Sequence, residues 1–255
     1  MSVTTFLQSL MPAAHRGGSG VRNRKGDVTR AAIVESALAV ARREGLESLT
    51  IGALADQMKM SKSGVFAHFG SREDLQLAVL KEYAVRFVDE VLRPAVKKPR
   101  GLPRLQAMLA NWLKLLAREV EQGCLMIGGA SEYDDRPGPL QDAMVAIIGG
   151  WSTELIRAID AAKESGDLRD DIDARQLAFE IYGLMLAFHQ SARLLRAGDS
   201  LKRARTALAR LLHDAAAANP LQLKSKRVPA RPRPVSLTKP PRVHVRREAA
   251  RTRGA

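Results

Sequence analysis

A run of polar and basic side chains between Ser61 and Arg72 carries the residue types best suited to contact a nucleic acid. Ser61 and Ser63 can donate or accept hydrogen bonds at base edges, and Lys62 can reach a guanine acceptor or a phosphate. His68 and Arg72 stand where basic groups would hold the sugar–phosphate backbone. The spacing therefore predicts DNA contacts, with base reading at the start of the run and backbone contacts at its end.

Two short helices joined by a tight turn must position these side chains. Thr50 is the expected N-cap of the first, and the free N–H groups at that helix start attract phosphate. Ser61 is the expected cap of the second. That helix buries Val65 and Phe69, while Phe66 lies about 100° round the helix and faces outward. A helix-turn-helix places its second helix in the major groove of DNA, whereas an ordinary helical hairpin would pack Phe66 on the next helix. The pattern alone leaves both arrangements open.

Between the two ends of the chain, apolar residues recur at helical spacing, and no segment alternates for long enough to predict a strand. The fold class is therefore all-α, with about nine helices. The first helix is expected to start at Asp27 or Thr29 and to close at Gly45. The fourth is expected to end before Pro94, because proline cannot continue a helix interior. Later helices are expected around residues 105–116, 125–130, 140–163, 173–196 and 199–218.

The net charge of +14 lies mainly at the two ends of the chain. Residues 219–255 carry +10 and residues 1–27 carry +3, which leaves only +1 for residues 28–218. Both ends lack sustained periodicity and are expected to be disordered basic tails. Four segments follow: the tails at 1–27 and 219–255, a DNA-binding domain at 28–75 and a helical domain at 76–218.

Composition excludes several classes of site and location. Cys124 is the single cysteine, so neither an intrachain disulfide nor a thiolate cluster can form, and a reducing, cytoplasmic location is expected. No apolar run approaches the roughly 20 residues needed to span a bilayer. We find neither the ligand spacing of a metal site nor a motif of a known enzyme class. We therefore expect no metal, no cofactor and no catalytic residues.

The motif from Met60 to Leu75, MSKSGVFAHFGSREDL, directly overlaps the end of the string TIGALADQMKM. Together they resemble the N-terminal domain of the TetR family of transcriptional regulators, whose typical motif is close to V-S-K-G-T-L-Y-H-H-F-x-S-K-E-E-L. The resemblance rests on motif over roughly Thr29–Tyr83 and on helix arrangement alone over residues 100–218. It implies a three-helix helix-turn-helix domain at the N-terminus. It also implies a C-terminal helical domain that binds an effector and dimerises.

The resemblance assigns DNA contact to eight residues: Thr50, Ser61, Lys62, Ser63, Gly64, Phe66, His68 and Arg72. Three positions depart from the family pattern. Phe66 replaces a usual Tyr and loses a hydroxyl that could bond a phosphate. Ser63-Gly64 replaces Gly-Thr and shifts the hydrogen-bonding position by one residue, and Met60 replaces Val in the turn. We therefore expect a base preference that differs from the family's usual one.

The resemblance also implies an effector pocket in the C-terminal half and a two-fold dimer formed by the last two helices. The candidate ligand-binding residues are Trp112, Met126, Trp151, Tyr182 and His189; Cys124, Tyr133 and Phe179 lie in the same region. The candidate interface residues are Ala187, Leu194, Leu195 and Leu208. For both sets, burial in the protein's own core is the alternative.

These inferences predict a sequence-specific DNA-binding transcriptional regulator, a repressor that an unknown small-molecule effector releases from a palindromic operator on double-stranded DNA. A homodimer is expected, because one short helix reads few base pairs and two helices related by a two-fold axis read a palindrome. The alternative is a nonspecific nucleic-acid binder driven by the tails, since residues 28–75 hold six basic and six acidic residues. An enzyme and a membrane partner are not expected.

Overall fold

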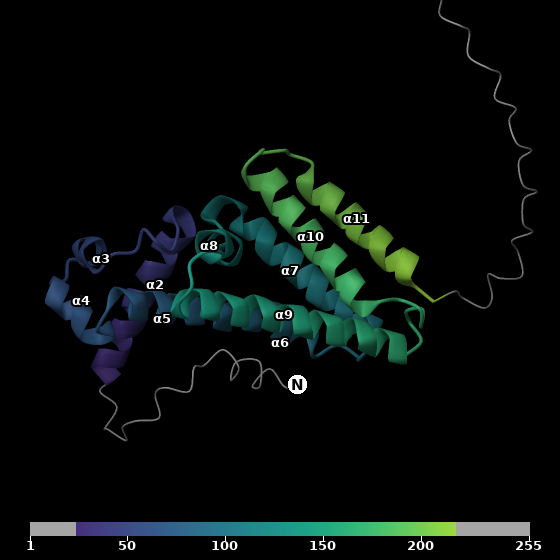
Figure 1. Cartoon of the computed structure of the whole chain (residues 1–255), viewed down its shortest axis with the longest axis horizontal. Helices are drawn as coiled ribbons and strands as arrows, with labels where there is room; N and C mark the ends of the chain where they lie inside the picture. The colour runs from purple at the N-terminus through teal and green to yellow at the C-terminus, as the bar shows by residue number, and fades with distance from the viewer. Residues whose placement is uncertain (1–23, 218–255) are drawn as a thin grey trace, which may run out of the picture. The chain divides into compact units, whose positions relative to one another are not determined.

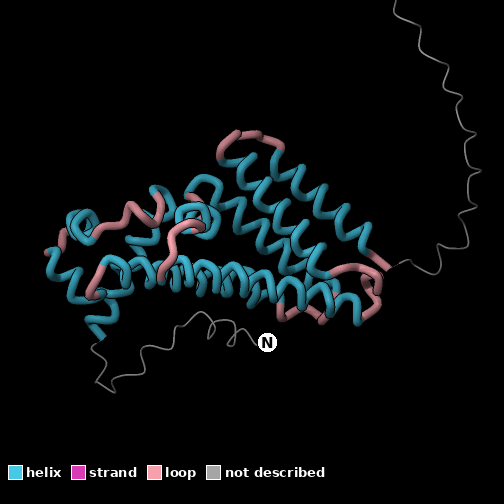
Figure 2. Tube along the Cα trace, in the orientation of Figure 1, coloured by secondary structure: helices cyan, strands magenta, loops and turns pink. Residues whose placement is uncertain are grey.

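The computed structural model describes residues 24–217, which fold into helices joined by short loops (Figures 1 and 2). In this range no strand occurs beyond one isolated bridge between Leu168 and Ala216. The all-α prediction is therefore confirmed. The helices are α2 (Arg24–Glu44), α3 (Ile51–Met58), α4 (Lys62–Phe69), α5 (Arg72–Phe87), the π-helix η1 (Val88–Leu92), α6 (Arg93–Ala95), α7 (Leu102–Gln122), α8 (Leu125–Tyr133), α9 (Pro139–Glu164), α10 (Ala174–Arg193) and α11 (Ser200–Ala215).

Glycine and small polar residues set the ends of the first helices. Gly45 follows α2 with φ +91°, the conformation expected of a glycine just past a helix. Thr50, Ser61 and Ser71 cap α3, α4 and α5, and each accepts a hydrogen bond from the N–H three residues on. Lys59 adopts the left-handed conformation that turns the chain between α3 and α4. The expected helix-turn-helix is confirmed, and its two helices pack on α2.

Two expected helix ends were wrong. α2 begins three residues before Asp27, so neither Asp27 nor Thr29 is its cap, and Asp27 instead places its charge in the first turn. The helix after α4 does not stop before Pro94, because η1 and α6 continue it. At the end of η1 the Arg93 N–H bonds the Val88 carbonyl, five residues back. This register shift places Pro94 in the first turn of α6, where proline's missing N–H is tolerated.

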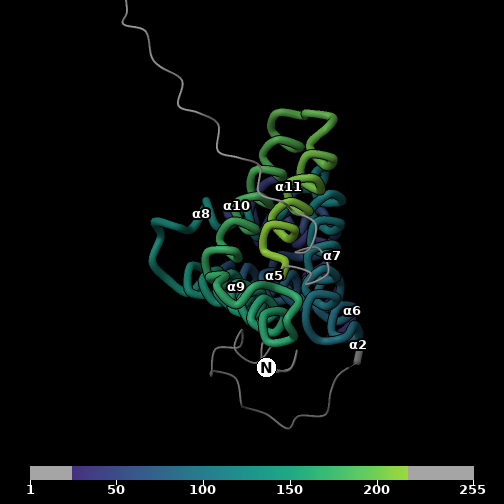
Figure 3. Tube along the Cα trace, turned by 90° about the vertical axis from the view of Figure 1, so that its right-hand side faces the viewer, coloured from purple at the N-terminus to yellow at the C-terminus, as the bar shows by residue number. Residues whose placement is uncertain are grey.

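The C-terminal half packs α7, α9 and α10 against one another, and α11 lies alongside α10 (Figures 1 and 3). Trp151 is fully buried at the centre of this core. Its ring meets Phe87 and Trp112 edge-on, with ring centroids 5.0 Å away in each case. Because Phe87 comes from α5, the helix that also packs on α2 and α4, α5 joins the two halves and crosses the domain boundary expected at residue 75.

Residues 1–23 and 218–255 lie outside the described range, and so do the basic tails predicted there, apart from residues 24–27, which belong to α2. Between residues 24 and 217, no helix combines the length and apolarity needed to cross a bilayer.

Candidate nucleic-acid interface and effector region

The second helix of the helix-turn-helix, α4, has one buried and one exposed face. Val65 and Phe69 are buried against the neighbouring helices. Lys62 and Ser63 are exposed, and Phe66 is 52% exposed. α4 therefore presents a polar start and an outward aromatic ring, while its core face is satisfied without either of them. This arrangement matches a helix that enters a groove.

The two serines at the start of α4 have different roles in the structure. The Ser61 hydroxyl accepts from the Gly64 N–H at 3.1 Å, and it lies 3.2 Å from the Ser63 hydroxyl. Because Ser61 caps the helix, its oxygen is largely occupied within the protein. Ser63 does not cap the helix, so of the two hydroxyls it is the better placed to bond a base edge. A Cβ on Gly64 would stand 3.0 Å from the Ser61 Oγ, so a larger residue there would crowd the cap.

The start of α3 and the Lys62 side chain form one cationic corner. The N–H groups of Ile51 and Gly52 precede the first helical bond, which joins the Leu54 N–H to the Thr50 carbonyl. Lys62 crosses this turn, since its Cε and Nζ lie 3.3 and 3.6 Å from where a Cβ on Gly52 would stand. An ammonium beside the positive end of a helix is a suitable phosphate site.

Arg72 is held by the protein itself. Its Nε donates to the Leu49 carbonyl at 2.7 Å, and one Nη donates to the carbonyl and the carboxylate of Glu47. These bonds tie the start of α5 to the loop before α3. Of the two basic residues expected to clamp phosphate, Arg72 is thus already engaged, and His68 is half-buried beside the Phe69 ring. Their contact with DNA stays a prediction.

The sequence did not reveal how the loop between α2 and α3 is fastened to α8. The Glu132 carboxylate accepts from the Leu46 N–H at 3.2 Å and the Glu47 N–H at 3.0 Å. The Tyr133 hydroxyl donates to the Glu47 carboxylate at 2.5 Å, and this bond, followed by Arg72, holds the pKa of Glu47 below its ordinary value. The end of α8 therefore holds the loop from which Thr50 and α3 begin.

A second polar connection is buried at the other end of α8. Arg42 of α2 pairs with the buried Glu119 of α7 at 3.1 Å, and Glu119 also accepts from the Tyr83 hydroxyl at 3.1 Å. The Cys124 thiol lies 3.4 Å from that hydroxyl. Burial and the neighbouring Glu119 raise the pKa of Cys124 to about 12, so its thiolate is scarce at neutral pH. Gly123 lies so close to α2 that a Cβ would stand 1.7 Å from the Arg42 carbonyl oxygen.

The structure brings together three of the five candidate ligand residues. Trp112 and Trp151 meet edge-on, and the centroids of the Tyr182 and Trp112 rings lie 5.7 Å apart. Met126 is buried on α8. His189 is half-buried two turns after Tyr182 on α10, and burial lowers its pKa. Trp112, Met126 and Trp151 are core residues, so ligand contact by any of the five stays a prediction.

The candidate dimer residues separate into two groups. Leu194 and Leu195 are 70% and 69% exposed, and Ala187 is also exposed on α10. Leu208 was wrongly expected to face a partner, since it is buried in this chain's own core. Phe179, which was expected in the region of the effector pocket, does not point into the core. It is 74% exposed on α10, the same helix as Ala187.

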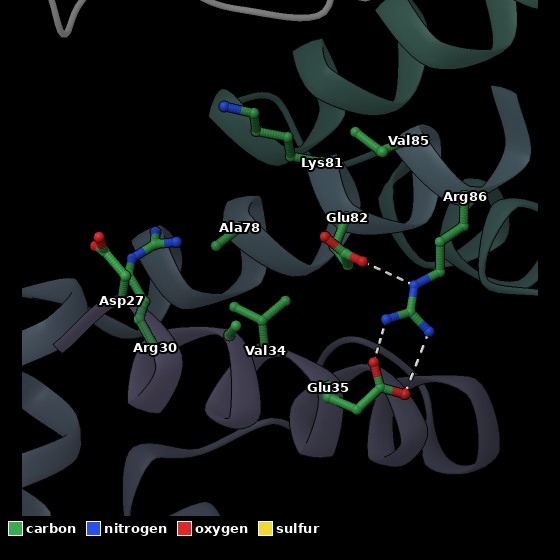
Figure 4. A pocket seen from close by; sticks show the side chains of 10 residues that line it. Asp27, Arg30, Val34, Glu35, Ala78, Lys81, Glu82, Val85 and Arg86 are labelled. Carbon is green, nitrogen blue, oxygen red and sulfur yellow. Dashed lines mark hydrogen bonds and ion pairs between the residues drawn. The ribbon is translucent and has the colours of Figure 1, made fainter. Parts of the chain in front are cut away.

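A cavity of about 450 Å³, open to solvent, lies between α2 and α5 (Figure 4). Arg86 pairs there with Glu35 of α2 and with Glu82, one turn back on α5. The Glu35 pair joins the two helices. Both pairs raise the pKa of Arg86, with the Glu35 hydrogen bond as the largest cause. The other lining residues are Asp27, Arg30, Ala31, Val34, Ala78, Lys81 and Val85. The sequence patterns did not indicate this cavity.

Known proteins share both halves of this arrangement. Residues 33–79 match the family model described as bacterial regulatory proteins, tetR family, and residues 101–208 match the one described as tetracyclin repressor-like, C-terminal domain. The HTH-type transcriptional regulator TcmR of Streptomyces glaucescens is 28% identical over 172 residues, which covers 62% of this chain and 70% of that protein. The HTH-type transcriptional regulator Rv0681 of Mycobacterium tuberculosis is 35% identical over 96 residues, 37% of this chain and 42% of that protein.

Solved structures of TetR-family regulators have the same fold as this chain. A TetR transcriptional regulator from Chloroflexus aurantiacus has 27% identity and a TM-score of 0.68, covering 76% of this chain and 98% of that one. A TetR-family regulator from Cytophaga hutchinsonii has the same fold at 20% identity, with a TM-score of 0.66 and coverage of 76% and 98%. With a helix-turn-helix and a C-terminal helical domain both matched, the chain belongs to the TetR family and is a DNA-binding transcriptional regulator.

Proposed function

We propose that the chain is a homodimeric repressor that binds a palindromic operator and leaves it when a small molecule binds the C-terminal half. The observation that carries this proposal is the exposed start of α4. There Lys62 and Ser63 face outward beside the unpaired N–H groups of α3, while Val65 and Phe69 alone satisfy the core. Such a helix can enter the major groove with a phosphate contact at its edge. A cytoplasmic location is part of the proposal.

Two copies are needed to read enough sequence. One helix of eight residues reaches only a few base pairs, whereas a two-fold dimer reads two half-sites. The exposed apolar side chains of α10 and the loop after it provide the interface in this proposal, with Phe179, Leu186, Leu194 and Leu195 as its main members. Apolar exposure of this kind is typical of surfaces that bind another protein.

Selection of bound duplexes from a random DNA pool tests the proposal. We expect the full chain to enrich a palindrome whose half-sites lie about one helical turn apart or more. Lys62→Ala should weaken binding to that palindrome, and Ser63→Ala should change the preferred base within each half-site. Lys114→Ala, which removes an exposed lysine on α7, is the matched control and should change neither property.

The same experiment decides between this function and nonspecific binding through the tails. A chain that ends at residue 218 should bind more weakly and still prefer the selected palindrome, because the tails supply only salt-dependent attraction. Enrichment of no common motif by the full chain, or complete loss of preference in the shortened chain, would overturn the proposal in favour of the nonspecific binder.

A further inference from the structure

The aromatic cluster of the C-terminal half contains two hydrogen-bond donors that the protein does not use. The indole Nε1 atoms of Trp112 and Trp151 are buried, and neither has a hydrogen-bond partner among residues 24–217. Buried polar groups in proteins are nearly always paired, so each exception requires an explanation. Two exceptions on rings that touch each other indicate a place where an outside group completes the bonding.

The ring at the edge of this cluster suggests how a ligand enters. Phe87, Trp151 and Trp112 are at most 2% exposed, whereas Tyr182 of α10 is only partly buried. The Tyr182 ring lies against Trp112 with a centroid distance of 5.7 Å and an angle of 43° between the rings. Tyr182 is therefore the member of the cluster that can swing outward and leave a flat, ring-sized space against Trp112.

The chemistry of the site selects the class of ligand. An indole N–H only donates, so the missing group must be an acceptor. A cation would be attracted to the ring faces but offers no acceptor. An anion would be repelled by the nearby Glu119 carboxylate. Glu119 lies beside Cys124, and Cys124 is close enough to Tyr182 for the two groups to interact electrostatically.

We propose that Trp112, Trp151 and Tyr182 form the effector site and that it takes an uncharged, planar ring compound bearing a carbonyl or similar acceptor. The ligand replaces the Tyr182 ring against Trp112 and accepts a hydrogen bond from a buried indole N–H. This inference rests on the proposed effector-controlled function, because it names the class of effector.

Displacement of Tyr182 has a physical route to the DNA-binding half. Tyr182 is close enough to Cys124 for the two groups to interact electrostatically. The Cys124 thiol lies 3.4 Å from the Tyr83 hydroxyl, and Tyr83 donates to Glu119. Glu119 pairs with Arg42 at the end of α2. A ligand that moves Tyr182 therefore changes the surroundings of an ion pair that joins α7 to α2, the helix on which the helix-turn-helix packs. The ligand can alter DNA affinity only by its differential affinity for the two states of the protein.

Two ring compounds that differ in one acceptor test the ligand class. Fluorenone carries a carbonyl on a planar three-ring system, and fluorene is nearly the same shape without it. Both tryptophans of the chain lie in the site, so quenching of their emission reports binding. We expect the full chain to bind fluorenone about tenfold more tightly than fluorene, the ratio that corresponds to one hydrogen bond of ordinary strength. Choline and benzoate, as cationic and anionic probes, should bind more weakly than fluorenone.

Three variants test the named residues, with thermal unfolding in the presence of each compound as the readout. Replacing both tryptophans by phenylalanine keeps two rings and removes both donors, and should reduce the preference for fluorenone over fluorene to less than about threefold. Tyr182→Ala should increase fluorenone affinity, because no ring has to be displaced. Tyr182→Phe keeps the ring and should leave the affinity unchanged.

Equal binding of fluorenone and fluorene to the wild-type chain overturns the proposal, even if the double tryptophan variant fails to fold. Tighter binding of choline or benzoate also overturns it. So does a carbonyl preference that survives without the indoles, since a group other than the indole N–H would then donate to the carbonyl. Loss of fluorenone binding in Tyr182→Ala contradicts displacement. DNA selection without any compound is an independent test. If it selects no operator, the proposed regulator function is wrong. If it selects an operator but the chain shows no preference for fluorenone, only this inference is wrong.

Discussion

At the scale of single residues, the residues proposed to contact DNA differ in the partners that they have within the protein. Lys62 and Ser63 are exposed, and Lys62 has only the open turn of α3 beneath it. Arg72 instead bonds Leu49 and Glu47, so its main effect is to hold the loop before α3 in position. The resemblance grouped all three as DNA contacts, and the structure gives them different surroundings.

This difference predicts a loss of stability for one basic substitution and almost none for the other. Arg72→Ala should lower the free energy of unfolding by about 1–3 kcal/mol, because the Leu49 carbonyl loses a charged donor, and should weaken DNA binding as a consequence. Lys62→Ala should leave stability within about 0.5 kcal/mol, weaken operator binding roughly tenfold and reduce the salt dependence by about one ion. Urea unfolding and binding titrations at several salt concentrations measure both. Equal stability losses in the two variants would contradict the assignment.

The buried carboxylate of Glu119 predicts a specific pH dependence. Burial, opposed by Arg42, raises the pKa of Glu119 above its ordinary value of 4.5. The folded state then binds more protons than the unfolded state above pH 4.5. The contribution of Glu119 to stability is therefore complete below that pH and is lost as pH rises through the folded-state pKa.

Glu119→Gln should remove this component. Between about pH 4.5 and neutrality, the slope of the unfolding free energy against pH should be more positive in Glu119→Gln than in the wild type. Urea unfolding at a series of pH values measures the slope. Glu121→Gln, an exposed neighbour on α7, is the control and should follow the wild type. Superimposable curves for Glu119→Gln and wild type would show that the two states hold this proton equally.

At the scale of elements, α8 is the bridge between the two halves. Cys124, just before its first residue, lies beside Glu119 of the Arg42–Glu119 pair, and its last residues hold the loop between α2 and α3. Gly123 allows the close approach, since its φ of +93° and the nearby Arg42 carbonyl both exclude a side chain. A shift of α8 must therefore change contacts on α2 and on the loop before α3.

Glu132→Ala tests this bridge. The substitution deprives the Leu46 and Glu47 N–H groups of their acceptor, so we expect a loss of about 1–3 kcal/mol in stability. Amide hydrogen exchange should accelerate in residues 45–49 more than in α9. Glu121→Ala removes an exposed carboxylate from α7 and should change neither. Unchanged exchange in residues 45–49 of Glu132→Ala would mean that other contacts hold the loop.

At the scale of the whole molecule, exposed apolar residues gather on α10 and the loop after it. Phe179, Leu194 and Leu195 are each at least 69% exposed, which is unusual for such large side chains. A second copy related by a two-fold axis would bury them and would present two copies of α4 to DNA.

Phe179→Glu should therefore produce monomers at micromolar concentration, because an unpaired charge would be buried at the interface, and operator binding should fall at least about tenfold. Sedimentation equilibrium and DNA titration measure the two effects. Val145→Glu is the matched control, since Val145 is a similarly exposed apolar residue (66%) on α9. A Phe179→Glu protein that sediments as a dimer would place the interface elsewhere.

Helix ends were the most predictable features of the fold. Thr50, Ser61 and Gly45 act locally, through bonds or backbone angles within four residues, so the sequence alone was sufficient to place them. Pro94 misled the prediction, because the π-helix before it shifts the hydrogen-bond register in a way that no local pattern reports.

The sequence by itself determined the helical class, the helix-turn-helix motif with its buried and exposed faces, and the concentration of charge at the two ends of the chain. These depend on periodicity, capping and composition, which involve neighbours along the chain. Tertiary structure decided that Arg72 supports a loop, that Leu208 is core, and that Glu119 and Glu132 fasten the two halves together. The bonds of Arg72, Glu119 and Glu132 join partners from 23 to 86 residues away, and the pairing of distant side chains follows only from how the helices pack.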